Sequence, residues 1–227
     1  MSDFRFQSVG FDLDGTLLDT FRDLGTAVNH ALELGGFDPV PVDSAKDLIG
    51  GGAKVMLARA VEDQGGMPED EFRRLYKAML RYYADHNAVH SVPYPGAREV
   101  VEALRQRGVR VAVVTNKFES FARAILEELD FLAPFETVIG GDTMGRFDDG
   151  RYRSKPHADP VLEARRRCGG GAMAFVGDST YDVQAARAAG LPVIAAAYGY
   201  CDRPAGELGA DAVIDSLDLL IATLERL

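Results

Sequence analysis

The chain has 227 residues, of which 47% are hydrophobic and 26% charged, and this composition predicts a globular protein with a substantial core. Its formal net charge of −10 argues against a nucleic-acid partner, because binding through many phosphates needs a basic face. No apolar run approaches the roughly 18 residues of a membrane span, and the first residues lack a signal-peptide pattern, so we expect a cytoplasmic protein without a membrane partner.

The first predicted strand ends in two acidic residues. Asp12 and Asp14 lie two positions apart in VGFDLDGTLLDT, residues 9–20, and Gly15 follows them directly. Successive side chains of a strand alternate between faces, so both carboxylates project to the same side. Two like charges in one small space raise the pKa of one carboxyl group unless a cation or a strong donor lies between them. This strand end therefore predicts such a cation or donor.

The stretch from residue 20 to about residue 90 carries helical patterns and no strand pattern. Apolar side chains recur at helical spacing in two stripes, Phe21, Leu24, Val28 and Ala31 in the first and Phe72, Leu75, Tyr76, Met79 and Tyr83 in the second. Between the stripes, Gly50, Gly51 and Gly52 separate two short helical segments. We predict that residues 19–90 form a helical cap, inserted after the first strand, that lies over the strand ends as a lid.

Residues 91–227 alternate between helical and strand patterns. The expected strands cover residues 109–114, 136–141, 172–178, 191–197 and 211–216, and the expected helices cover residues 96–108, 118–130, 157–167, 180–190 and 217–227. Strands that alternate with helices favour right-handed crossovers and a parallel sheet covered on both faces. The sequence thus predicts an α/β core built from residues 1–18 and 91–227.

Polar residues follow several segments at one edge of the predicted sheet. They are Asp12 and Asp14 after the first strand, Thr115 and Asn116 after VAVV, Lys155 at the start of KPHADP, and Gly177 and Asp178 after AMAFV. Ligands of parallel sheets gather at the carboxyl ends of the strands, so we expect these side chains in one crevice. Carboxylates from Asp12, Asp14 and Asp178 make an oxygen site that suits Mg²⁺ together with a substrate phosphate.

This combination of residues is typical of phosphoryl transfer. An aspartate can attack phosphorus and form an aspartyl phosphate, and Asp12 is the candidate nucleophile. Asp14 is the candidate acid that protonates the leaving oxygen and later takes a proton from water. Thr115 and Lys155 are the candidate groups that stabilise negative charge on the transferred phosphoryl group.

Two further assignments have a purely structural alternative. Asn116 fits a substrate contact and, with Glu119 three residues later, a helix cap about equally well. Gly51, Gly52 and Lys54 fit either the binding of a substrate anion at a helix start or an ordinary turn. Both alternatives stay open at the level of the sequence.

Helix capping explains other polar residues at predicted helix starts. Thr20 and Ser179 each precede an acidic residue by three positions, and for both we favour capping over a role in the site. Asp182 is expected to cap its own helix and to orient Lys155, without binding metal directly.

Four stretches, FDLDGTLLDT, VVTNK, SKPHADP and FVGDSTYD, resemble the four ordered motifs of the haloacid dehalogenase-like hydrolase superfamily. The resemblance implies a Rossmann-like core with a helical cap inserted after the first motif. The implied catalytic residues are Asp12 as nucleophile, Asp14 as general acid and base, Thr115 as a phosphate contact and Lys155 as a charge stabiliser. The resemblance also implies an Mg²⁺ ion held by Asp12, the carbonyl of Asp14 and Asp178.

Within that superfamily, VIGGD, KPHADPVL, FVGDSTYDVQAARAAG and YGY are similar to the phosphoglycolate phosphatase-like branch. This similarity implies 2-phosphoglycolate, a small phosphorylated metabolite, as the substrate. We expect a monomer or homodimer. The chain departs from the branch at Tyr181, where Asn is frequent, and at residues 50–53, where Gly-Asn-Gly-Ala is frequent. Sugar phosphates such as N-acetylmuramate 6-phosphate stay open as substrates, as does a phosphomutase or pyrophosphatase of the same superfamily.

Overall fold

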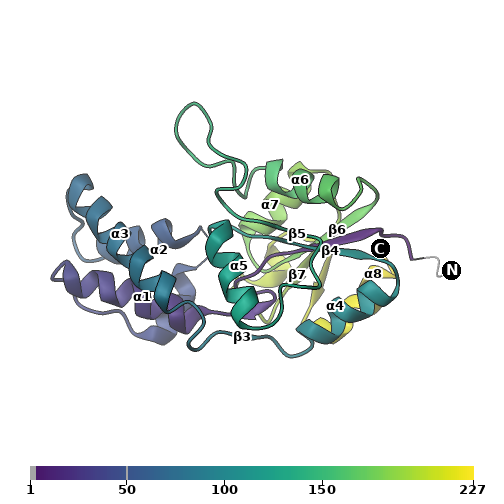
Figure 1. Ribbon diagram of the computed structural model, residues 1–227, viewed down its shortest axis with the longest axis horizontal. Coiled ribbons are helices and arrows are strands. Elements are labelled where there is room, and N and C mark those ends of the chain that lie inside the picture. Colours follow the sequence, from purple (N-terminus) through teal and green to yellow (C-terminus); the bar gives the residue numbers. More distant parts are fainter. Residues whose placement is uncertain (1–3, 50) are drawn as a thin grey trace.

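The computed structural model describes residues 4–49 and 51–227, and its centre is a parallel sheet (Figure 1). The strands of this sheet are β1 Ser8–Phe11, β4 Arg110–Val114, β5 Thr137–Ile139, β6 Met173–Gly177, β7 Val193–Ala196 and β8 Ala212–Ile214. Across the sheet they run in the order β5-β4-β1-β6-β7-β8, and neighbouring strands are parallel throughout. The expected α/β fold is therefore confirmed. The strand order changes direction beside β1, where parallel sheets open a crevice for ligands.

Helices cover both faces of the sheet (Figure 1). The helices α4 Ala97–Gln106, α5 Glu119–Glu128 and α8 Leu220–Leu224 share one hydrophobic core with the sheet, and α6 Asp159–Arg167 and α7 Thr180–Ala188 share another. Alternation along β4 serves both cores, because Val111 and Val113 belong to the first and Ala112 and Val114 to the second. This two-sided burial holds the strand ends at a common edge.

A group of helices lies to one side of the sheet (Figure 1), and we call its residues 21–85 the cap. It contains α1 Phe21–Leu34, a 3₁₀ segment Val42–Leu48, α2 Ala53–Glu62 and α3 Glu69–Asp85. Both apolar stripes expected from the sequence meet in one hydrophobic core between these helices. Of the three glycines between them, Gly50 lies outside the described residues, and Gly52 precedes α2 with φ of +86°. The domain boundaries at residues 18 and 90 stay a prediction.

The two connections between the cap and the sheet run side by side. The strands β2 Leu18–Asp19 and β3 Val92–Pro93 form a two-residue antiparallel ribbon, for which the sequence pattern gave no signal. Above the ribbon, the buried carboxylate of Asp23 accepts hydrogen bonds from the backbone N–H groups of His90 and Ser91. No helix in the described parts of the chain combines the length and the hydropathy that crossing a bilayer requires.

Candidate active site

The carboxyl ends of three neighbouring strands bring the predicted site residues together. Asp12 follows β1, Thr115 follows β4 and Asp178 follows β6, and all three line one cleft between the sheet and the cap. Gly15, with φ of +85°, turns the chain behind the first motif, and a Cβ there would lie 2.2 Å from Asp178 Oδ2. Only glycine allows the backbone this close to the Asp178 carboxylate, so the turn and the carboxylate depend on each other.

Lys155 is buried at the centre of this site. Its ammonium lies 2.7 Å from Asp12 Oδ1 and 2.6 Å from Asp182 Oδ1. Burial alone would lower the pKa of Lys155, but the two carboxylates hold that pKa above its ordinary value. The lysine is therefore charged, and its position is set by an ion pair on each side.

Asp182 connects this lysine to the start of α7. Its second oxygen, Oδ2, accepts hydrogen bonds from the backbone N–H and the hydroxyl of Ser179, at 3.0 Å and 2.6 Å, which completes a capping box. The capping expected for Ser179 is thus present, and Asp182 also contacts Lys155 as expected. One fully buried carboxylate thus contacts Lys155 and caps the start of a helix.

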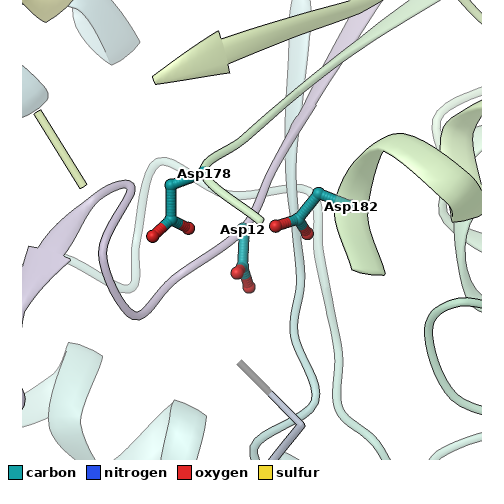
Figure 2. A group of neighbouring side chains, drawn as sticks. All are labelled: Asp12, Asp178 and Asp182. Atoms are coloured by element: carbon teal, nitrogen blue, oxygen red, sulfur yellow. The ribbon is translucent and has the colours of Figure 1, made fainter. Parts of the chain in front are cut away.

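Three carboxylates gather around the same point (Figure 2). Asp12 lies between Asp178 and Asp182, and one oxygen of each lies within 4.8 Å of the others. Burial raises the pKa of Asp12 to about 7, with a contribution from the Asp182 charge and against the lowering effect of Lys155. Burial and the charges of Asp182 and Asp12 likewise raise the pKa of Asp178 well above its ordinary value.

These raised pKa values describe a site that needs a further cation to keep its carboxylates ionised. Clustered hard oxygen ligands of this kind suit a divalent ion. The positive charge of such an ion would lower the pKa values that burial and the neighbouring carboxylates raise. Asp178 is held for such a role, because Thr16 and the backbone N–H of Tyr200 donate to its two oxygens at 3.1 Å and 2.8 Å. The donor set therefore fits a metal ion at this strand edge.

The Asp14 side chain points to a different set of partners. Its Oδ1 atom lies 2.9 Å from the Lys117 ammonium and accepts a hydrogen bond of 2.6 Å from the Thr20 hydroxyl. Within the described chain, the group of three neighbouring carboxylates that could hold a metal ion contains Asp182 where the sequence suggested the Asp14 carboxylate, although both oxygens of Asp182 already contact Lys155 or Ser179. The Asp14 side chain is therefore separate from the cluster and is directed toward the cleft.

The capping assigned to Thr20 is wrong, and the capping alternative left open for Asn116 is excluded. Thr20 makes no side-chain cap for α1, because its hydroxyl donates to Asp14 and the first N–H groups of the helix donate to the Tyr200 hydroxyl. Asn116 does not cap α5 either, since that helix begins at Glu119, whose N–H donates to Asp142 Oδ1 at 2.8 Å. In both places a side chain distant in sequence supplies the cap.

Asn116 and the glycine segment of the cap meet at the cleft. Asn116 lines the cleft, and its amide donates to the backbone carbonyl of Lys155 at 3.1 Å. Gly52 also lines the cleft, whereas Gly51 lies beside Tyr181 and outside the lining. Lys54 is exposed and does not line the cleft. Substrate contacts by Asn116 and the glycines stay predictions, and the position of Lys54 gives no support to one.

Sequence reasoning missed the residues that complete the cleft. Lys117 follows directly after Asn116, and nothing in the sequence separates it from a solvated lysine, yet its side chain is 4% exposed. The cap side of the cleft consists of Leu24, Ile49, Gly52, Ala53, Tyr76, Leu80 and Tyr83, and the core adds Phe118, Phe121 and Tyr200. Of these residues, Leu24, Tyr76 and Tyr83 belong to the stripes that the sequence assigned to hydrophobic packing alone.

Comparisons with known proteins agree with this geometry. A family model described as haloacid dehalogenase-like hydrolase matches residues 6–190, a range that includes all four motifs. A phosphoglycolate phosphatase from Agrobacterium fabrum is 39% identical over 217 residues, which cover 94% of this chain and 90% of that protein. A phosphoglycolate phosphatase from Chromobacterium violaceum is 36% identical over 217 residues and 94% of each chain.

A solved structure resembles the whole molecule. The crystal structure of a predicted phosphoglycolate phosphatase from Haemophilus somnus 129pt has a TM-score of 0.87 and 31% sequence identity. The match covers 98% of this chain and 100% of that one. Both the sheet and the cap therefore have counterparts in the same solved protein.

Proposed function

The chain belongs to the haloacid dehalogenase-like hydrolase family, and from that premise we propose that it hydrolyses 2-phosphoglycolate with Mg²⁺ as cofactor. The chain is a phosphatase. The observation that carries the proposal is the buried Lys155, which is paired with Asp12 and Asp182 at the edge of the sheet. A charged lysine and a carboxylate of raised pKa at one point suit the transfer of a phosphoryl group.

In the proposed reaction, Asp12 is the nucleophile and Asp14 is the general acid and base. An oxygen of Asp12 attacks phosphorus, the bond from phosphorus to the ester oxygen breaks, and Asp14 gives its proton to that oxygen. Water then attacks the aspartyl phosphate and gives a proton to Asp14, which releases inorganic phosphate and restores Asp12. Lys155 and Thr115 stabilise the charge on the phosphoryl oxygens during both steps.

The Mg²⁺ ion would be held by Asp12, Asp178 and the backbone carbonyl of Asp14. When bound, it neutralises charge on the phosphate and between the carboxylates. Thr16 and the N–H of Tyr200 orient Asp178 for this contact.

The chemistry of the cleft supports a small substrate. Its cap side is mostly apolar and aromatic, with the hydroxyl groups of Tyr76 and Tyr83 as its side-chain polar groups among the described lining residues. A sugar phosphate such as N-acetylmuramate 6-phosphate would leave many hydroxyl groups without partners there, which costs binding free energy. The curated relatives named phosphoglycolate phosphatase support the same choice.

A phosphatase screen with and without chelator tests the proposal. We expect the purified protein with Mg²⁺ to release inorganic phosphate from 2-phosphoglycolate with a higher kcat/KM than from N-acetylmuramate 6-phosphate, pyrophosphate or nucleotides. Isomerised ester in place of free phosphate would identify a phosphomutase, and a preference for a sugar phosphate would refute the substrate assignment.

A further inference from the structure

Lys117 is a buried lysine that the proposed chemistry leaves without a function. Among the described residues that line the cleft, it alone has a positively charged side chain. Its ammonium forms a buried ion pair with the Asp14 carboxylate, and this pairing favours the charged form of the lysine. A buried ammonium is costly unless each of its donors finds an acceptor, and Asp14 Oδ1 at 2.9 Å accounts for one of three.

Tyr83 presents a second polar group beside this lysine. It belongs to α3 of the cap, is 2% exposed, and its ring lies 4.9 Å from the Lys117 ammonium. Tyr83 lines the cleft, and the Lys117 ammonium beside its hydroxyl can only donate, so in the described chain this hydroxyl has no acceptor for its hydrogen. Burial raises the pKa of this hydroxyl to about 12, against the effect of Lys117, so it is a neutral donor. A buried donor without an acceptor points to a ligand that supplies one.

The start of α2 brings backbone donors to the same place. Gly52 and Ala53 line the cleft, and a Cβ at Gly52 would lie 3.3 Å from the carbonyl oxygen of Asn116, the residue before Lys117. Gly52 is the N-cap of this helix and makes no side-chain cap. The first N–H groups of a helix find no acceptor within it, and its partial positive charge favours an anion.

We propose that Lys117 and Tyr83, together with the start of α2, bind the carboxylate of the substrate. This inference rests on the proposed function and extends it, because it gives the second anionic group of 2-phosphoglycolate its own site. The ester oxygen and the carboxyl carbon of this molecule are separated by a single methylene group. A cation that binds the carboxylate must therefore lie beside the residue that protonates the ester oxygen, as Lys117 does beside Asp14.

A pair of substrates separates carboxylate binding from an effect on Asp14. The second substrate is 2-hydroxyethyl phosphate, which has the same chain length and no carboxylate. The measured quantity is the selectivity, defined as kcat/KM for 2-phosphoglycolate divided by kcat/KM for 2-hydroxyethyl phosphate. Both esters need a proton from Asp14, so a disturbance of Asp14 slows both reactions and cancels in the selectivity.

We expect Lys117→Met to lower the selectivity about 100-fold, because it removes a buried charged partner of the carboxylate. A selectivity within about threefold of the wild type would overturn the proposal, since Lys117 would then act only on Asp14. Lys77→Met is the matched control, because Lys77 is an exposed lysine of α3 outside the cleft, and it should leave the selectivity unchanged.

Tyr83→Phe keeps the ring and removes only the hydroxyl, so it provides a second test if Lys117→Met does not fold. Its selectivity should fall about tenfold, and an unchanged selectivity would overturn the proposed site. The wild-type screen tests the proposed function separately. If the wild type prefers another carboxylated phosphoester, that function fails, and the same selectivity measured with that ester and its carboxylate-free analogue still decides the Lys117 site.

Discussion

The two walls of the cleft differ in how their polar groups are satisfied. On the core wall, Lys155 contacts Asp12 and Asp182, and the Asp178 carboxylate has a donor at each oxygen. The cap wall is apolar and aromatic, and the buried hydroxyl of Tyr83 has no acceptor for its hydrogen in the described chain. The core wall is therefore organised before substrate arrives, whereas the cap wall still has a donor to offer.

This difference assigns separate tasks to the two walls. Preorganised charges at the phosphate act on every phosphoester alike, because the reacting group is the same in each. Groups that contact the remainder of the molecule discriminate between esters, since a buried donor rejects a substrate that leaves it unpaired. Substitutions of Asp12, Asp178, Asp182 or Lys155 should thus change the rate for all substrates, whereas substitutions of Lys117 or of the cap residues beside it should change the preference among them.

The largest effect is expected for Asp12→Asn, which keeps the size of the side chain and removes the nucleophilic carboxylate. Turnover should fall by about 10⁴-fold or more for every ester tested, because the covalent step has no substitute on this wall. Steady-state release of phosphate measures the loss.

Thermal unfolding provides the control for this variant. The substitution removes one of the two ion pairs of Lys155 but also relieves the repulsion of Asp12 by the neighbouring carboxylates, so the Tm should fall less than in Asp182→Asn. A folded variant that retains activity within about tenfold of the wild type would remove Asp12 as the nucleophile and with it the division of tasks.

Metal removal should have the next largest effect, and that effect depends on pH. Chelation should lower turnover of all esters by at least about 100-fold. In the metal-free protein the pKa of Asp12 is raised from 3.8 to about 7, so the folded chain holds a proton that the unfolded chain releases. Stability without metal therefore falls as pH rises through this range, and bound Mg²⁺, which favours the ionised carboxylate, restores it.

Thermal melts with Mg²⁺ and with EDTA measure this dependence without any substrate. The increase in Tm caused by Mg²⁺ should be larger near pH 8 than near pH 5. Asp178→Asn should reduce the increase at both pH values, because it removes a proposed ligand. An increase that is independent of pH would show that the ion binds away from these carboxylates.

Asp182→Asn tests whether the position of Lys155 depends on Asp182, a residue that does not itself react with the substrate. The substitution removes one of the two ion pairs of buried Lys155, and this should cost about 3 kcal/mol of unfolding free energy and about 100-fold in kcat. Denaturant unfolding and steady-state kinetics measure the two losses. Ser179→Ala is the control, because it weakens the helix cap by about 1 kcal/mol and keeps the ion pair. Equal losses of kcat in both variants would contradict the orienting role.

Most of the core wall could be predicted from the sequence. Asp12, Thr115 and Asp178 each follow a short strand that the hydrophobic pattern locates, and the ends of parallel strands converge by rule. The Ser179 and Asp182 pair is local, so its spacing alone predicts the capping box. For these residues, local pattern and sheet topology were sufficient.

The cap wall could not be predicted in the same way, because its contacts join distant parts of the chain. Tyr83 lies on a helical stripe that predicts packing, and only the approach of the cap to the core brings it beside Lys117. The start of α1 shows the same limit. Local spacing predicts Thr20 as its cap, but the group that accepts from its first N–H groups is the hydroxyl of Tyr200, 180 residues away from Thr20. Local patterns give no information on which side chain another part of the chain will supply.

Tyr200→Phe has the smallest expected effect. It tests whether the hydrogen bonds between a core loop and the first cap helix affect substrate binding. The Tyr200 hydroxyl accepts from the N–H groups of Thr20 and Phe21 at 2.6 Å and 3.0 Å, and so joins a core loop to the first helix of the cap. Its removal should cost about 1 kcal/mol of unfolding free energy in a urea titration, while the ring keeps its edge contact with Phe21.

Tyr198→Phe is the matched comparison, because the Tyr198 hydroxyl donates to the carbonyl of Thr16 within the core, at 2.9 Å. Both variants lose one phenolic hydroxyl, and Tyr200→Phe should lose more stability, because its hydroxyl also donates to Asp19 at 2.9 Å. If the cap closes over substrate through the α1 connection, only Tyr200→Phe should raise KM, by about two- to fivefold, because it loosens the cap while the Tyr200 backbone N–H still holds Asp178. Equal KM values in the two variants would mean that the cap binds substrate independently of this hydroxyl, and the task of each wall would then be set by its own lining residues alone.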